Sequence, residues 1–234
     1  MKKNICVLGN SHVGALKRAW DLMTEWHQEY NLVFFTARSN GLGGLILIDN
    51  KLVPKTDRLK RTITYTSGGK SEIDIVEYDL FLIYGLQMEV FFVEPGKFFS
   101  SAVIKQTVLD SVKGTTSWTI MEMIRSVTNK KIYVGHNPLP IQKKGDDRSY
   151  PPESYLSGIK LMNDEVYDKC NAELIAQPAD TIVNGCFTER ELSKGSKRLP
   201  VGDAMDEEAH PDHDIRHMNE EFGKKWLSCF LSRD

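Results

Sequence analysis

The sequence contains no long hydrophobic run. A membrane-spanning helix needs about 20 consecutive apolar residues, and no stretch of this chain approaches that length. The amino terminus opens with Met and two lysines, as a signal peptide would, but the apolar run that follows lasts only about five residues, which is shorter than a secretory hydrophobic region. We therefore expect no membrane span and a cytoplasmic location, and we expect residues 4–8 to form a buried strand.

Cysteine is scarce, and basic residues do not dominate. The cysteines form no CxxC pair, which favours reduced thiols over a disulfide framework or a zinc site; the four are Cys6, Cys170, Cys186 and Cys229. The formal net charge is −2, and the chain has none of the concentrated basic character that nucleic acid requires. We expect no nucleic-acid partner and no cofactor, and the sequence leaves the oligomeric state open.

The length and composition suit one globular domain. The chain has 234 residues, of which 41% are hydrophobic and 26% charged, so it can build a packed core. No internal repeat or low-complexity tract divides it. We expect a single domain over residues 1–234.

Short apolar runs alternate with amphipathic helical patterns along the chain. Strands that alternate with helices form right-handed βαβ units, which predicts an α/β fold with a five-stranded, mainly parallel sheet between two layers of helices. The main strands are expected at residues 4–8, 32–36, 79–84, 131–134 and 181–183.

Residues 45–75 differ from this pattern and predict a small β insertion. A Ser67-Gly68-Gly69 turn separates two short apolar or β-branched runs, as in a hairpin. The insertion is expected to contain short strands at residues 45–48, 61–66 and 72–75.

Ser11 lies where the first predicted strand turns into the first helix. Ligands bind at the carboxyl ends of the strands in such a sheet, so the Ser11 hydroxyl is expected at that edge. Its backbone N–H would lie at a helix N-terminus, where negative charge is favoured. An acyl-transfer nucleophile has these requirements, because the developing oxyanion can use the same N–H. A simple helix cap is the alternative role for this serine.

The segment before the last predicted helix contains an acid and a base. Asp214 precedes His217 by three residues. Serine must lose its proton to attack, and neutral imidazole is the usual acceptor. If the segment turns, the Asp214 carboxylate can hold the second ring nitrogen and stabilise the imidazolium. A solvated loop whose acid caps a helix is the alternative.

These two segments resemble sequence blocks of the SGNH (GDSL-like) serine hydrolases. Gly9-Asn10-Ser11-His12 is similar to their Gly-Asp-Ser block, with Asn10 in place of the usual Asp. Asp214-x-x-His217-x-Asn219-x-x-Phe222-Gly223 is similar to their last block. The resemblance covers nearly the whole chain outside residues 45–75. It implies a flavodoxin-like three-layer α/β/α sandwich and a catalytic triad of Ser11, His217 and Asp214.

The resemblance also implies three oxyanion donors: the serine N–H, a glycine N–H after the second strand and an Asn side chain after the third. The glycine is expected within residues 40–44, where Gly41 is preferred and Gly43 and Gly44 stay open. Gln87 stands where the family has Asn, and it carries the same carboxamide one methylene further out. Asn137, after the fourth strand, is the second candidate, and a loop residue without a role is the alternative for Gln87.

Two other classes of function stay open. His210, His213 and His217 lie close together with Asp212 and Asp214, which is compatible with a metal-dependent hydrolase. Pro211 interrupts any helix that would align these rings, so no metal is expected. A non-catalytic domain that binds a glycan or a partner is the other class, because Gln87 departs from the family pattern.

A second histidine competes for the role of base. Glu207 lies three residues before His210, which repeats the acid–histidine spacing of Asp214 and His217. We prefer His217, because Asn219 and the Phe-Gly entry to the last helix follow it. The resemblance then implies an esterase that hydrolyses or transfers an acyl group on a small-molecule or glycan ester, and by family analogy we expect an O-acetyl group on a carbohydrate.

Overall fold

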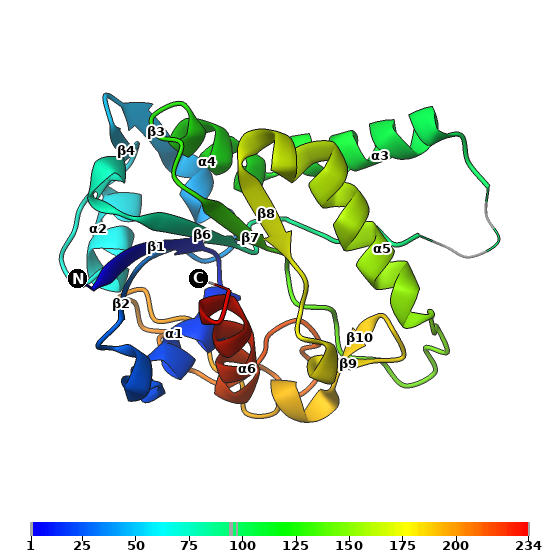
Figure 1. Cartoon of the computed structure of the whole chain (residues 1–234). Helices are drawn as coiled ribbons and strands as arrows, with labels where there is room; N and C mark the ends of the chain where they lie inside the picture. Colours follow the sequence, from blue (N-terminus) through cyan, green and yellow to red (C-terminus); the bar gives the residue numbers. More distant parts are fainter. Residues whose placement is uncertain (1, 94–95, 97, 234) are drawn as a thin grey trace.

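A five-stranded parallel sheet forms the centre of the molecule (Figure 1). The computed structural model describes residues 2–93, 96 and 98–233. Neighbouring strands follow the order β2-β1-β6-β7-β8, and every pair is parallel. The strands are β1 (Lys3–Gly9), β2 (Tyr30–Thr36), β6 (Leu80–Tyr84), β7 (Ile132–Gly135) and β8 (Ala172–Ile175). This is the flavodoxin-like strand order, and the predicted fold class is confirmed.

The apolar runs of the strands reflect burial on both faces of the sheet. Successive side chains of a strand point to opposite faces. In β1, Ile5 and Val7 belong to one hydrophobic core, and Cys6 and Leu8 belong to the other. The first strand is interior, between β2 and β6, as its uninterrupted apolar character predicts.

Helices cover both faces and complete the three layers (Figure 1). One layer contains α1 (Val13–Leu22) and α6 (Glu220–Leu231), whose buried residues share a core with Val7 and Tyr84. The other layer contains α2 (Asp57–Thr66), α3 (Ser101–Lys113), α4 (Thr116–Arg125) and α5 (Pro152–Met162). Within the described residues, no helix is both long and apolar enough to cross a bilayer.

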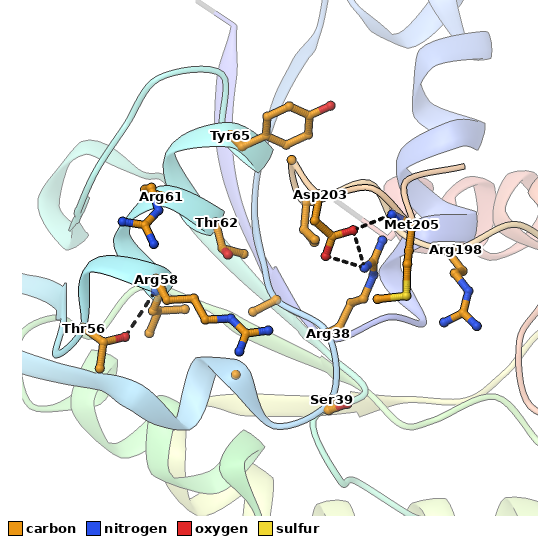
Figure 2. Close-up of a pocket in the computed structure, with 15 residues that line it drawn as sticks. Arg38, Ser39, Thr56, Arg58, Arg61, Thr62, Tyr65, Arg198, Asp203 and Met205 are labelled. Atoms are coloured by element: carbon orange, nitrogen blue, oxygen red, sulfur yellow. Dashed lines mark hydrogen bonds and ion pairs between the residues drawn. The ribbon is translucent and has the colours of Figure 1, made fainter. Parts of the chain in front are cut away.

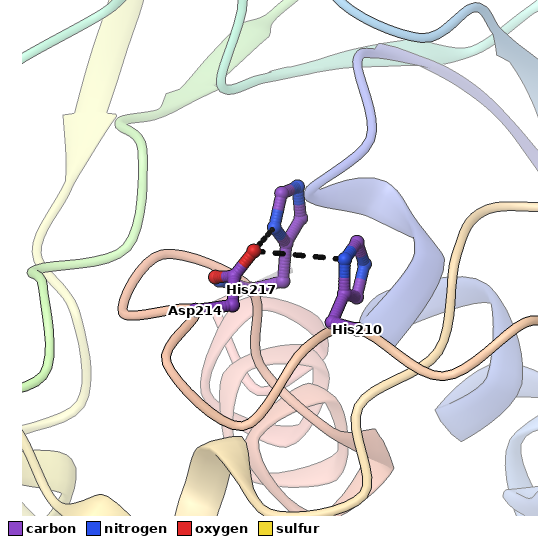
Figure 3. Close-up of side chains that lie close together, drawn as sticks. All are labelled: His210, Asp214 and His217. Atoms are coloured by element: carbon purple, nitrogen blue, oxygen red, sulfur yellow. Dashed lines mark hydrogen bonds and ion pairs between the residues drawn. The ribbon is translucent and has the colours of Figure 1, made fainter.

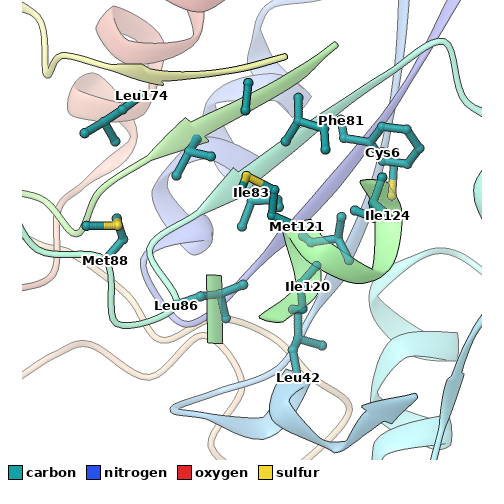
Figure 4. Close-up of a cluster of buried hydrophobic side chains, with 14 of the residues drawn as sticks. Cys6, Leu42, Phe81, Ile83, Leu86, Met88, Ile120, Met121, Ile124 and Leu174 are labelled. Atoms are coloured by element: carbon teal, nitrogen blue, oxygen red, sulfur yellow. The ribbon is translucent and has the colours of Figure 1, made fainter. Parts of the chain in front are cut away.

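The core of the second layer centres on α4. Figure 4 shows Ile120, Met121 and Ile124 of this helix packed on Phe81 and Ile83 of β6. Fully burying one such side chain contributes about 1.5–3 kcal/mol. This packing holds the carboxyl end of β6, and the turn that follows it, against the start of α4.

The small β excursion is present, but one of its predicted strands is wrong. Its three-stranded antiparallel sheet contains β3 (Leu45–Ile48), β4 (Lys51–Pro54) and β5 (Ile73–Asp74). Residues 61–66 were expected to form a strand and instead end α2. The β-branched residues there obscured a helical pattern in which Leu59, Ile63 and Thr66 are buried. The Thr56 side chain caps this helix by accepting a hydrogen bond from the Leu59 amide at 3.2 Å.

The fifth strand was also predicted in the wrong place. The structure has β8 at the edge of the sheet, whereas the sequence favoured residues 181–183. Two of these residues instead form β9 (Ile182–Val183), which pairs with β10 (Phe187–Thr188) in a two-stranded ribbon. The β8 sequence was overlooked because Glu173 interrupts its apolar run. A polar residue is tolerated there because β8 is an edge strand and Glu173 is partly exposed.

Gly223 allows α1 and α6 to approach closely. A Cβ atom at this position would lie 2.2 Å from the Ala15 carbonyl oxygen and 2.9 Å from the Ala19 Cβ. We therefore expect Gly223→Ala to push the two helices apart and to lower the free energy of unfolding by about 1–3 kcal/mol, as measured by urea denaturation. Gly114→Ala is the matched control, because its new Cβ would meet nothing nearer than 4.0 Å. Equal stability of the two variants would contradict this account of the α1–α6 contact.

Candidate active site

The candidate site lies where the strand order reverses. The chain places β2 on one side of β1 and β6 on the other, and ligands of open α/β sheets bind at the carboxyl ends of strands at such a switch point. Ser11 lies two residues beyond the end of β1, and Gly85 follows β6 directly. The Gly85 amide donates to the Gly135 carbonyl at 2.8 Å, which joins the carboxyl ends of β6 and β7.

Ser11, His217 and Asp214 form one continuous chain of hydrogen bonds. The Ser11 Oγ lies 2.9 Å from the His217 Nε2. On the far side of the ring, the His217 Nδ1 lies 2.8 Å from the Asp214 Oδ2 (Figure 3). The fold therefore brings together the three residues that the sequence singled out, although Ser11 and His217 are 206 positions apart. His217, not His210, is the histidine that contacts Ser11.

A tight turn places Asp214 under the ring of His217. The Asp214 Oδ1 accepts hydrogen bonds from the Arg216 amide at 2.7 Å and from the His217 amide at 2.9 Å. Asn219 then caps α6, since its Oδ1 accepts from the Phe222 amide at 3.2 Å. Asp214 thus fixes both the backbone that carries His217 and the orientation of the imidazole.

The same hydrogen bonds keep Asp214 ionised. Burial by itself would raise the pKa of this carboxyl. The Arg216 and His217 amides and the His217 ring outweigh burial and lower the pKa to about 2. Asp214 is therefore a carboxylate at neutral pH and accepts a hydrogen bond from the His217 Nδ1–H, which leaves the Nε2 lone pair facing Ser11.

Two further histidines stack on His217. The His210 ring lies parallel to it, with a centroid separation of 3.8 Å and an interplanar angle of 6°. The His12 ring also stacks on His217, with a centroid separation of 5.0 Å and an interplanar angle of 28°. Burial, and to a lesser extent the positive charge that His217 can carry, lowers the pKa of His12 to about 3 and that of His210 to about 4. His217 therefore stacks with two neutral rings.

Little in the sequence indicated this stack. No role was predicted for His12, and His210 was considered as a rival base with Glu207 and as a member of a possible metal site. In the structure Glu207 lies 3.6 Å from the Arg18 guanidinium, and the His210 Nδ1 lies 3.6 Å from the Asp214 Oδ2. The proximity of His210 to His217 in sequence, and the acid–histidine spacing that the two pairs share, indicated that His210 lies near the site but not that it stacks there.

The Ser11 amide is available as an oxyanion donor, whereas the Gly41 amide is not free. Among the described residues, no acceptor is present for the Ser11 N–H. The Gly41 N–H donates to the Arg38 carbonyl at 3.1 Å, and the Gly43 N–H donates to the Asn40 carbonyl at 3.0 Å. Gly41 has a packing reason to be glycine, because a Cβ there would lie 2.7 Å from the Ala37 Cβ. The expected role of Gly41 would therefore require this turn to open.

The turn after β6 holds Gln87 in an unusual conformation. Gly85, Leu86 and Gln87 have consecutive positive φ angles of 75°, 52° and 67°. A left-handed conformation costs of order 1–3 kcal/mol at a residue other than glycine. A strained conformation of this kind is kept only where contacts with the rest of the structure hold it. Here the Ser117 amide of α4 donates a hydrogen bond to the Leu86 carbonyl at 3.1 Å and holds the turn.

Thr116 orients the carboxamide of Gln87. The Gln87 Oε1 accepts from the Thr116 amide at 3.3 Å and from its hydroxyl at 2.9 Å. The same hydroxyl contacts the Asn40 carboxamide. Because the hydroxyl has a single hydrogen, it donates to either the Gln87 Oε1 or the Asn40 Oδ1 at one time, while the Thr116 amide donates to Gln87. The Gln87 Nε2 has no acceptor among the described residues and is exposed at the edge of the sheet.

Asn137 is oriented differently. Its Nδ2 donates to the Glu89 carboxylate at 2.7 Å, and its Oδ1 is buried without a partner in the described part of the chain. A Cβ at Gly85 would lie 2.6 Å from the Asn10 Oδ1 and 3.1 Å from the Asn137 Oδ1, so the two carboxamides flank this glycine. Asn137 uses one of its two amide hydrogens on Glu89, whereas the Gln87 Nε2 has no acceptor among the described residues, so Gln87 has the greater free donor capacity.

His210, Asp214 and His217 are the described residues that could hold a metal ion, since their ligand atoms lie within 4.8 Å of one another (Figure 3). Two parallel imidazoles direct their nitrogen lone pairs along parallel lines, whereas a single ion needs ligands that converge on it. An ion would also replace the hydrogen bond between Asp214 and His217. The geometry therefore favours the hydrogen-bonded chain over a metal centre.

Comparisons with known proteins add a likeness of fold. No protein-family model and no curated protein sequence matches this chain. Among solved structures, it is similar to the periplasmic domain of a lipopolysaccharide acetyltransferase from Salmonella ser. Paratyphi A. The two share 14% identity and superpose with a TM-score of 0.47 over all of this chain and 84% of the other. This likeness is too low to assign an activity.

The stacked histidines should make the folded protein sensitive to acid. The pKa of His210 falls from 6.5 to about 4 in the folded state. Between these values the unfolded chain binds a proton that the folded protein does not, so the free energy of unfolding falls as the pH falls. At pH 5 the loss amounts to about 2 kcal/mol for this residue.

We expect His210→Phe, which keeps an aromatic ring against His217, to reduce the loss of stability between pH 7 and pH 5 by about that amount. Urea unfolding at the two pH values measures it. His213→Phe is the control, because His213 is exposed and outside the stack. If His210→Phe and the wild type lost the same free energy, His210 would not be held neutral in the folded state.

Proposed function

We propose that this protein is an SGNH-type serine esterase that hydrolyses or transfers an acyl group, with Ser11 as the nucleophile, His217 as the base and Asp214 as the residue that orients the base. The observation that carries the proposal is the unbroken hydrogen-bonded chain from the Ser11 Oγ through His217 to Asp214. Its position at the switch point of the sheet, where ligands bind, supports the same conclusion.

The first half of the proposed reaction forms an acyl-enzyme. The Ser11 Oγ attacks the ester carbonyl carbon while its proton moves to the His217 Nε2, and a tetrahedral oxyanion forms. The oxyanion collapses, the bond between the carbonyl carbon and the alkoxy oxygen breaks, and the proton on Nε2 passes to the leaving alcohol. The ionised Asp214 stabilises the imidazolium that exists between these two proton transfers.

The second half releases the acyl group. Water, or the hydroxyl of an acceptor, gives its proton to the His217 Nε2 and attacks the acyl carbon. Collapse of the second oxyanion breaks the bond to Ser11 and returns the proton to its Oγ. Hydrolysis and transfer differ only in which hydroxyl enters, so one site is compatible with both.

Two donors are proposed for the oxyanion. The Ser11 N–H is the first, and the Gln87 Nε2 is the second, because Thr116 holds its carboxamide oxygen and leaves the nitrogen free. One such donor contributes about 2.7–4 kcal/mol to the transition state. Gln87 would then act in place of the Asn found in the family, and the left-handed turn over residues 85–87 sets its position. The proposed substrate is an O-acetyl ester, on a small molecule or a carbohydrate.

Two other functions make different predictions for the same protein. A metal-dependent hydrolase using His210, Asp214 and His217 would lose activity to a chelator and keep it without the serine hydroxyl. A non-catalytic binding domain would turn over no ester at all. The stacked geometry of the rings argues against the first, and the hydrogen bond between Ser11 and His217 argues against the second.

Variants of the three residues should separate these functions. We expect Ser11→Ala and His217→Ala each to lower kcat on p-nitrophenyl acetate by about 10³-fold or more and to be similarly damaging, because members of such a unit do not act additively. Asp214→Ala should cost less, since Asp214 takes no proton. EDTA should leave the wild-type rate unchanged.

The control variants change the two histidines that stack on His217. His210→Phe and His12→Phe should keep most of the activity, because neither ring contacts Ser11. Equal rates for the wild type and Ser11→Ala would remove Ser11 from the mechanism, and loss of activity to EDTA would favour the metal-dependent alternative.

A further inference from the structure

A large pocket rich in arginine lies beside the candidate active site (Figure 2). Its volume is about 950 Å³. It lies between α2, the turn that follows β2, and residues 198–205 near the carboxyl end of the chain. Four arginines line it against a single acidic residue, Asp203; they are Arg38, Arg58, Arg61 and Arg198.

Two of these arginines are already paired. Arg38 donates to both carboxylate oxygens of Asp203, at 2.8 and 2.7 Å, and to Asp206 at 3.0 Å. The Asp206 carboxylate also accepts the Val201 amide at 2.8 Å. These contacts fasten the 198–206 loop to the end of β2. Arg198 lies 3.4 Å from Glu208. Their charge is therefore largely compensated within the protein.

Arg58 and Arg61 are different. Neither makes a hydrogen bond or an ion pair with any described residue, and both are exposed on α2. Figure 2 shows the Arg58 side chain extending from α2 toward the side of the pocket that holds Arg38. A guanidinium offers a planar fork of donors that matches carboxylate and phosphate oxygens. The pocket therefore presents two guanidinium groups whose hydrogen-bond donors are not used by described residues, although the charge of Arg58 also acts on Asp203.

The rest of the lining suits a carbohydrate. Ser39 and Thr62 supply hydroxyl groups, which donate and accept hydrogen bonds. Tyr65 is 55% exposed, so much of its aromatic surface is open to a ligand. A Cβ at Gly202 would lie 3.1 Å from the Tyr65 Cδ2, so the loop backbone supports one side of the ring.

Backbone hydrogen bonds join the segments that line the pocket to the segments around Ser11. At the end of β2, the Ala37 amide donates to the Gly9 carbonyl at 3.2 Å, two residues before Ser11. At the other wall, the His210 amide donates to the Ser196 carbonyl at 2.8 Å. The Arg198 charge also helps to lower the pKa of His210, although burial lowers it most. These backbone hydrogen bonds connect the lining of the pocket, through Gly9 and Ser196, to the segments that carry Ser11 and His210.

We propose that this pocket binds the anionic group of the ester substrate, and that the substrate is an acylated acidic sugar whose carboxylate or phosphate is held by Arg58 and Arg61. This inference rests on the proposed esterase function for the reacting end of the substrate. Binding of the anion does not depend on catalysis, so binding and ester cleavage can be measured separately.

The binding half is tested in Ser11→Ala, which cannot turn an ester over by the proposed route. Galacturonate and glucose 6-phosphate are titrated into it by calorimetry, with galactose and glucose as neutral partners. We expect saturable binding of at least one anion, weakened by salt, and no binding of the neutral sugars. Adding Arg58→Gln or Arg61→Gln should weaken the affinity by about tenfold each, as loss of a charged hydrogen bond does. The anion that binds more tightly identifies carboxylate or phosphate as the natural group.

The catalytic half compares O-acetyl galacturonate with its neutral methyl ester. The wild type should prefer the acid in kcat/KM, and Arg58→Gln and Arg61→Gln should each lower that preference by about tenfold, mainly through KM. Lys60→Gln is the matched control, because it removes the same charge from the same helix outside the lining of the pocket. Rates on p-nitrophenyl acetate should stay within about twofold for all three variants, which also shows that they fold.

The outcomes distinguish the two proposals. Anion binding that depends on Arg58 and Arg61, in a protein that cleaves no ester, would support the pocket and contradict the esterase function. Ester cleavage with no anion binding and no preference for the acid would contradict the pocket and leave the esterase function standing. If Lys60→Gln lowered the preference for the acid as much as Arg58→Gln and Arg61→Gln do, the effect would come from the overall charge of the protein, and the proposed site would be overturned.

Discussion

The contact between α1 and α6 is the constraint on which the candidate site depends. Gly223 lets α6 rest on the backbone of Ala15 in α1. Because α1 begins two residues after Ser11 and α6 begins three residues after His217, this packing fixes the separation of two side chains from opposite ends of the chain. The sheet supplies the rest, since β1 lies beside β6 and so places Ser11 next to the turn that carries Gln87.

Electrostatics around Ser11 follow from the same arrangement. Asp214 is ionised, with a pKa of about 2, while burial keeps His12 and His210 neutral at physiological pH. In the proposed mechanism, positive charge develops on His217, which stacks with two uncharged rings and is hydrogen-bonded to one carboxylate. Arg58 and Arg61, which form no ion pair with a described residue, line the pocket and would attract an anionic substrate there without competing for Asp214.

Local pattern was enough to predict the parts of the molecule that are buried or contiguous in sequence. Short, uninterrupted apolar runs marked β1 and β6, and motifs at the two ends of the chain predicted the hydrogen bonds that join Ser11 to His217 and His217 to Asp214. Strand β8 was missed because an edge strand needs no continuous apolar run. The stacking of His12 and His210 on His217 depends on how loops distant in sequence pack, and the left-handed turn at Gln87 depends on tertiary contacts with α4. No local signal encodes either feature.

Covalent labelling tests the central claim most directly, because a fluorophosphonate reacts with a serine only when a base activates it. The account predicts one adduct on the wild-type protein by intact mass, located by peptide mapping at Ser11. It predicts no adduct on Ser11→Ala and strongly slowed labelling of His217→Ala. An unlabelled wild type, or a Ser11→Ala variant that labels as fast as the wild type, would contradict it.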